Sequence, residues 1–120
     1  MRIDKDLVAA SATTLVLGIL SEGDLYGYAI VKRVAELSGG RMQWTDGMLY
    51  PLLHRLERLG FVSASWGTSE AGRPRKHYAI TPAGRAALVD RQEQWRVVAD
   101  ALHQVWQTAQ RPAGTAEVWA

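Results

Sequence analysis

The stretch TDGMLYPLLHRLERLGFV, residues 45–62, decides the fold. Thr45 is a suitable N-cap, Asp46 suits a first helical turn, and Gly60 suits a helix end. Leucines recur at helical spacing and form one apolar stripe: Leu49, Leu52, Leu53, Leu56 and Leu59. The stretch therefore predicts a helix whose leucines face a core. Because Pro51 lacks a backbone N–H, we expect this helix to kink or to begin late.

The flanking sequence predicts the remaining elements. Their expected order is helices at about 6–21, 27–37 and 45–60, strands at 61–66 and 77–80, and a helix at about 82–110. The run Ser38-Gly39-Gly40 ends the second helix, and Thr81-Pro82 begins the last one. Three helices, a hairpin and a long helix make a mainly α fold with a small β-hairpin. This is a winged helix-turn-helix domain (residues 1–80) followed by a long C-terminal helix (81–110), and we expect a disordered tail at 111–120.

Composition excludes several classes of protein. A chain of 120 residues is long enough for one domain, and without cysteine it has no disulfide framework, thiolate nucleophile or zinc knuckle. The longest apolar stretch runs from Leu7 to Leu20, which is shorter than the ~20 residues of a membrane span. The first six residues lead into no cleavage-site pattern. We therefore expect a cytoplasmic protein with no membrane partner.

Positive charge gathers in the middle of the chain. Residues 41–80 hold six Lys or Arg against three Asp or Glu, in a chain of net charge +2. The face of the third helix opposite the leucines carries residues suited to phosphates and base edges, and the hairpin loop adds three cations, partly offset by Glu70. The predicted partner is double-stranded DNA, and the candidate contacts are Thr45, Gly47, Tyr50, Pro51, His54, Arg55, Arg58, Arg73, Arg75 and Lys76. The alternative is a solvated basic surface without a ligand.

Catalysis finds little support in the sequence. The three histidines, His54, His77 and His103, lack metal-site spacing. No serine lies in a nucleophile elbow, and Gly39-Gly40 opens no phosphate loop. We expect no enzymatic activity, no cofactor and no metal.

The last helix predicts dimerisation. Its apolar residues recur at heptad spacing: Leu88, Trp95, Leu102 and Ala109, with Val98 and Val105 three positions further on. A helix of ~28 residues spans ~42 Å, more than one small domain needs for its own core. We therefore expect a two-fold homodimer; packing of this helix on the first helix alone is the alternative.

Trp95 and Ala99 form a candidate effector site. On the first helix, the small residues Ser11, Thr14 and Gly18 share a stripe that could leave space opposite an indole. Two such indoles at a dimer axis would make a slot for a small aromatic or cationic planar ligand. In the alternative interpretation Trp95 only fills the interface. The other central tryptophans, Trp44, Trp66 and Trp106, are expected to be core or shielding residues.

Four motifs resemble the PadR family of bacterial transcriptional regulators, in its shorter subgroup. They are MLYPLLHRLERLGFV (48–62), YGYAI (26–30), GRPRKHY (72–78) and ITPAGR (80–85), and the resemblance covers about residues 10–90. It implies a dimeric, ligand-responsive repressor that binds a pseudo-palindromic operator. The family tyrosine falls on Tyr50, and the basic wing residues fall on Arg73, Arg75 and Lys76. Met48 departs from the threonine that members often carry after Gly47.

Two other functions are compatible with these patterns. The winged helix could be a protein–protein interaction module without specific DNA binding. The chain could also be a ligand-binding protein whose DNA affinity is incidental. Both alternatives predict no protected palindromic site, and the first also predicts little dependence of binding on salt.

Overall fold

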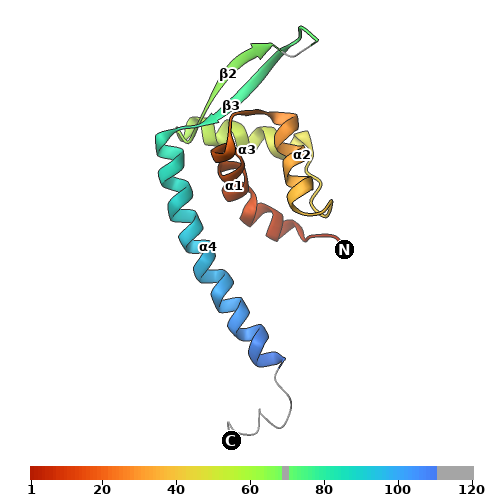
Figure 1. The fold of residues 1–120 in the computed structure, drawn as a ribbon, viewed down its shortest axis with the longest axis vertical. Coiled ribbons are helices and arrows are strands. Elements are labelled where there is room, and N and C mark those ends of the chain that lie inside the picture. Colours follow the sequence, from red (N-terminus) through yellow and green to blue (C-terminus); the bar gives the residue numbers. More distant parts are fainter. Residues whose placement is uncertain (69–70, 111–120) are drawn as a thin grey trace, which may run out of the picture. The chain divides into compact units, whose positions relative to one another are not determined.

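The computed structural model describes residues 1–68 and 71–110 (Figure 1). The elements are α1 (Lys5–Glu22), β1 (Leu25–Tyr26), α2 (Gly27–Leu37), α3 (Asp46–Arg58), β2 (Val62–Thr68), β3 (Pro74–Ile80) and α4 (Pro82–Ala109). The predicted fold class, a winged helix-turn-helix with a long C-terminal helix, is confirmed. Residues 1–89 form one compact unit, and a second unit begins at Asp90. The predicted tail at 111–120 and the offsetting charge of Glu70 lie outside the described residues.

The sheet has one strand more than the hairpin predicted from sequence. Its order is β1-β3-β2, all antiparallel, and β1 pairs through Leu25 with Tyr78 and through Tyr26 with His77. Two residues are too few to show a period of two, so this strand was not predicted. The hairpin itself pairs from Val62 with Ile80 out to Thr68 with Pro74, and it projects beyond the three helices (Figure 1).

The core gathers around the leucines of α3. Leu49, Leu52, Leu53 and Leu56 are all at most 6% exposed, and they pack with residues of α1, α2 and the sheet that include Leu17, Leu20, Ile30, Val34 and Tyr78. Burying each leucine stabilises the fold by about 1.5–3 kcal/mol. The fifth residue of the predicted stripe is different: Leu59 is 56% exposed, because α3 has ended and the chain turns away.

The ends of α3 also differ in part from expectation. Thr45 occupies the N-cap position, but its side chain makes no capping hydrogen bond. The expected late start is wrong, since α3 begins at Asp46 and continues through Pro51. The proline removes only one backbone donor, and the buried leucines on either side hold the helix together.

The end of α2 and the beginning of α4 follow the prediction. After α2, Gly39 and Gly40 both have positive φ, and the Gly40 N–H donates to the carbonyl of Ala35 over 2.8 Å. Before α4, the Thr81 hydroxyl accepts a hydrogen bond from the Gly84 N–H at 3.0 Å, which confirms Thr81 as the N-cap. That hydroxyl also donates to the Gly60 carbonyl, so it fastens the beginning of α4 to the end of α3.

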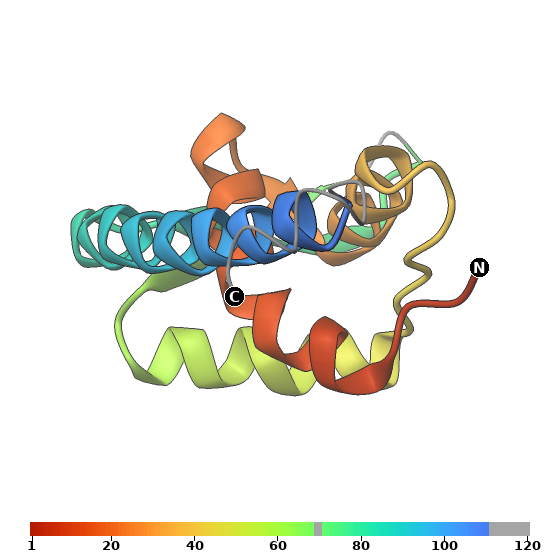
Figure 2. The same ribbon diagram turned by 90° about the horizontal axis from the view of Figure 1, so that it is seen from below.

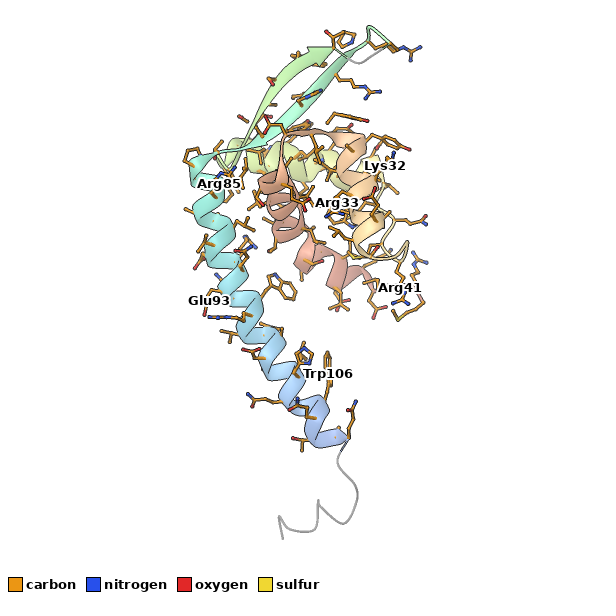
Figure 3. All side chains as sticks on the ribbon, in the orientation of Figure 1. Lys32, Arg33, Arg41, Arg85, Glu93 and Trp106 are labelled. Atoms are coloured by element: carbon orange, nitrogen blue, oxygen red, sulfur yellow. The ribbon has the colours of Figure 1, made fainter. Side chains whose placement is uncertain are left out.

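Of the three tryptophans expected to be core or shielding residues, only one is buried. Trp44 is 5% exposed, whereas Trp66 is 72% and Trp106 is 50% exposed. Trp66 lies far out on β2, where the hairpin has left the core, and Trp106 lies near the end of α4 (Figure 3). Trp66 and Trp106 are therefore not core residues of the single chain.

The predicted dimer seam needs one correction. Leu88 is 6% exposed and belongs to the core of the first unit, so it is already covered by its own chain. Further along α4 the apolar residues Val97, Val98, Leu102, Val105 and Trp106 are each between 44% and 65% exposed. No helix among the described residues is long and apolar enough to cross a membrane. The second half of α4 thus carries an exposed apolar face.

Gly84 allows the first turn of α4 to lie against the end of α3. A Cβ at this position would lie 2.0 Å from the carbonyl oxygen of Phe61, a backbone atom that cannot rotate away. By contrast, a Cβ on Gly18 in α1 would meet nothing within 4 Å.

We expect Gly84→Ala to destabilise the protein by roughly 3 kcal/mol, because the backbone must shift to admit the methyl group. Gly18→Ala should instead be stabilising by about 0.5–1 kcal/mol, as expected in a helix interior. Thermal unfolding followed by circular dichroism measures both. Equal unfolding temperatures for Gly84→Ala and the unsubstituted protein would contradict the close approach.

Candidate nucleic-acid interface

The outward face of α3 is set by burial of its leucines. Because Leu49, Leu52, Leu53 and Leu56 point inward, the intervening positions must point outward. All the predicted contact residues of this segment are exposed: Thr45, Gly47, Tyr50, Pro51, His54, Arg55 and Arg58. The face therefore presents a phenol, an imidazole and two guanidinium groups to solvent.

Tyr50 lies against the beginning of α2. A Cβ on Gly27 would stand 2.6 Å from the Tyr50 hydroxyl oxygen and 2.9 Å from the ring carbon that bears it. The tyrosine is 36% exposed, so part of the ring is covered while the rest remains accessible. Gly27 thus provides the space that sets the position of this side chain.

The hairpin cations are held by contacts within the chain. The Arg75 guanidinium carbon lies 4.2 Å from the ring centre of Tyr26, a cation–π contact between β3 and β1. Lys76 Nζ lies 3.9 Å from a carboxylate oxygen of Glu57 on α3. Arg73 is exposed near the turn. Arg75 and Lys76 therefore have defined positions near the helices.

A groove of about 480 Å³ separates the hairpin from the helices. Besides the predicted Tyr50, His54, Arg75 and Lys76, it is lined by Tyr26, Tyr28 and Trp66, which were not predicted as contacts. Trp66 stands opposite Lys76 in the register of the hairpin. One feature of the sequence could have indicated this position of Trp66. It lies on the same face of the strand as Val62 and Ala64, but further along the hairpin, where the strand has passed the core.

One ionisable group of this region is shifted. Burial, with smaller contributions from Tyr50 and Glu57, raises the pKa of the Tyr78 phenol above its usual range. This tyrosine is 1% exposed and remains neutral at physiological pH. Tyr78 consequently acts as the buried floor of the groove.

The predicted effector residues fall in two separate units. On α1, the Ser11 hydroxyl donates to the Leu7 carbonyl at 2.8 Å, and Thr14 Oγ1 is buried without a partner among the described residues. On α4, Trp95 and Ala99 are both half-buried. Proximity between the two groups remains a prediction. No cluster of three potential metal ligands occurs in the described part of the chain.

An exposed helix face beside an aromatic and cationic hairpin, on a three-helix core, is the geometry of a winged-helix regulator of transcription. The sequence pattern of the transcriptional regulator PadR-like family matches residues 16–90. The chain belongs to this family, as its motifs indicated. Membership makes it a transcriptional regulator and not an enzyme, and implies DNA binding.

Proteins of known structure agree with this assignment. A PadR family transcriptional regulator from Eggerthella lenta is 33% identical, with a TM-score of 0.73 over 86% of this chain and 88% of its own. A transcriptional regulator from Clostridium thermocellum is 28% identical, with a TM-score of 0.76 over 83% and 97%. In sequence, the transcriptional regulator Rv3488 of Mycobacterium tuberculosis is 46% identical over 55 residues, which cover 46% of this chain and 50% of that protein.

The contact between Gly27 and Tyr50 can be tested through DNA affinity. We expect Gly27→Ala to leave folding nearly intact, because the added methyl meets only the tip of a side chain. It should weaken DNA binding by about 1 kcal/mol, roughly fivefold, by displacing the Tyr50 hydroxyl. Fluorescence anisotropy with a labelled duplex measures the change.

Tyr50→Phe is the matched comparison for this experiment. If both changes act through the same hydroxyl, the double variant should bind no more weakly than the weaker single variant. Additive losses would show that Gly27 acts through something other than Tyr50.

Proposed function

We propose that the protein is a homodimeric, sequence-specific transcriptional repressor. In this proposal α3 enters the major groove and the hairpin follows the neighbouring backbone. The observation that carries it is the outward face of α3, where His54 and Arg55 are exposed next to Tyr50. Two such faces would meet half-sites of a pseudo-palindromic operator about one helical turn apart, ~34 Å.

The contacts divide into two kinds. Tyr50 and Arg75 line the groove and suit phosphates, because a phenol and a guanidinium both donate hydrogen bonds to phosphate oxygens. His54, which also lines the groove, and Arg55 follow on α3, and an imidazole and a guanidinium suit base edges. Lys76 would contribute less to phosphate binding than an isolated lysine, because the nearby Glu57 carboxylate partly neutralises its charge. Trp66 is largely exposed in the same groove, where it would pack against the sugar-phosphate backbone.

Variants should separate the two kinds of contact. Arg75→Ala should weaken binding to every duplex and flatten the dependence of affinity on salt, as loss of a phosphate contact does. Substituting His54 or Arg55 by alanine should relax preference at particular base pairs, costing roughly 1–3 kcal/mol there. Selection of bound sequences from a random duplex library, followed by titrations at several salt concentrations, measures both effects.

Arg85→Ala is the control, because this exposed arginine lies at the beginning of α4 outside the groove (Figure 3). Equal losses on selected and random duplexes for all three interface variants would contradict base reading. With ~6 phosphate contacts, affinity should fall ~10³-fold between 50 and 200 mM salt. Binding whose affinity does not change with salt concentration would instead favour the alternative function, a protein–protein interaction module.

Dimerisation in this proposal uses the apolar face of α4. Val98, Leu102 and Val105 are exposed in the single chain and share heptad spacing. Ala109 continues the pattern at the end of the helix, and Trp95 begins it one heptad before Leu102. Covering this face with a second copy would remove apolar surface that water otherwise contacts.

Leu102→Glu should convert the dimer into a monomer, because the seam would have to bury two carboxylates. Gln104→Glu places the same charge on the same helix outside the seam and should leave the dimer intact. Sedimentation equilibrium measures both molecular masses. A Leu102→Glu variant that stays dimeric would place the interface elsewhere.

Repression would be relieved by a ligand at the dimer axis. Trp95 and Ala99 of both copies, facing Ser11, Thr14 and Gly18, would bind a small aromatic or cationic planar molecule. The unpartnered Thr14 hydroxyl supports a polar group of the ligand at this position. A coupling of about 1–3 kcal/mol between ligand and DNA would lower operator affinity 5- to 150-fold.

A further inference from the structure

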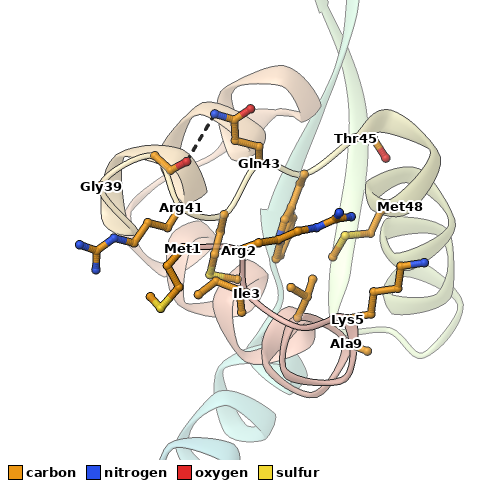
Figure 4. Close-up of a pocket in the computed structure, with 14 residues that line it drawn as sticks. Met1, Arg2, Ile3, Lys5, Ala9, Gly39, Arg41, Gln43, Thr45 and Met48 are labelled. Atoms are coloured by element: carbon orange, nitrogen blue, oxygen red, sulfur yellow. Dashed lines mark hydrogen bonds between the residues drawn. The ribbon is translucent and has the colours of Figure 1, made fainter.

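A second cavity lies at the opposite end of α3 from its C-terminal arginines, where the first residues of the chain meet the connection between α2 and α3. Its volume is about 800 Å³ (Figure 4). Figure 2 shows the N-terminal half of α1 next to the beginning of α3, and residues of both segments line the cavity. We propose that it binds an anionic aromatic molecule. None of its lining residues is among those proposed above for the effector site.

The cavity has apolar walls of the size that an aromatic ring requires. Ile3 and Val8 line it from the N-terminal segment and α1, Met42 and Trp44 from the connection between α2 and α3, and Met48 from α3. Methionine side chains adapt to the outline of a planar ligand, and an indole offers a flat surface for stacking. Volumes of 300–1,000 Å³ are typical of small-molecule sites.

The connection that forms one wall is fixed by its own hydrogen bonds. The Met42 N–H donates to the Ser38 hydroxyl at 2.8 Å, and the Gln43 side-chain amide donates to the Gly40 carbonyl at 3.4 Å (Figure 4). Gly39 and Gly40 adopt the positive φ angles that this turn needs. The wall is therefore formed before any ligand arrives.

Trp44 supplies an unsatisfied donor at this site. The residue is only 5% exposed, and its Nε1 is buried without a hydrogen-bond acceptor in the described part of the chain. A buried donor without a partner costs about 1–3 kcal/mol. A ligand oxygen that reached this N–H would satisfy it.

The charge of the lining selects an anion. Arg2, Lys5 and Arg41 line the cavity, and none of its lining residues is acidic. In Figure 4 Arg2 extends across the cavity toward Thr45 and Met48, and Lys5 lies on the same side, whereas Arg41 points the other way. A carboxylate or sulfonate on an aromatic ring would meet the first two cations.

An occupant would also contact the DNA-reading helix. Thr45 and Met48, at the beginning of α3, both line the cavity. Ligand binding there would change the position of the helix and so the affinity for DNA. This consequence rests on the proposed function, whereas the binding itself does not.

The test uses a matched pair of fluorescent probes and the full chain. Anilinonaphthalene-8-sulfonate is an anionic aromatic probe, and N-phenyl-1-naphthylamine has the same rings without the sulfonate. We expect one anionic probe per chain, bound at least fivefold more weakly by the double variant Arg2→Gln/Lys5→Gln, while the neutral probe is unaffected. Arg85→Gln, a loss of one cation outside the cavity, should change neither titration.

The outcomes distinguish this cavity from the dimer axis. Trp95→Ala should leave binding of the anionic probe unchanged if the probe occupies the cavity proposed here. Loss of binding in Trp95→Ala, with no effect of Arg2→Gln/Lys5→Gln, would overturn the proposal, and so would equal losses for both probes. Thermal unfolding confirms that each variant is folded, and duplex titrations with and without probe report the coupling separately.

Discussion

Burial of the α3 leucines is the constraint on which the rest of the structure depends. Four leucines at 6% exposure or less fix the rotation of the helix about its own axis. Once that rotation is fixed, every other side chain of α3 has a defined direction, and His54, Arg55 and Tyr50 all lie on the exposed side of the helix. The same four residues pack with α1, α2 and the sheet in one core. The contacts that stabilise the fold are therefore also the contacts that orient the exposed face of α3.

Much of this arrangement could be predicted from periodicity. The leucine stripe, the paired glycines after α2 and the Thr81 cap each rest on local chemistry that acts over a few residues, and the structure contains all three. The family motifs lie in the same segments. For this reason the fold class and the outward face of α3 followed from the sequence.

Three of the failures have a common physical cause, which is the arrangement of residues far apart in the chain. Strand β1 has only two residues, and its pairing with β3 depends on a hairpin some fifty residues away. Leu88 fitted a heptad, yet the first unit buries it. Trp66 resembled a core residue by type, but the hairpin carries it past the core. Neither the spacing nor the type of these residues indicates which distant segments they approach in the folded chain.

The short strand β1 has a mechanical consequence. It joins the base of the hairpin to the first residue of α2, and the stacking of Arg75 on Tyr26 lies at the same junction. The hairpin is thereby tied to the helices by a third strand and a cation–π contact, unlike a hairpin held only by its own two strands. Under the proposed function, the hairpin and α3 would therefore move together when the protein approaches a duplex.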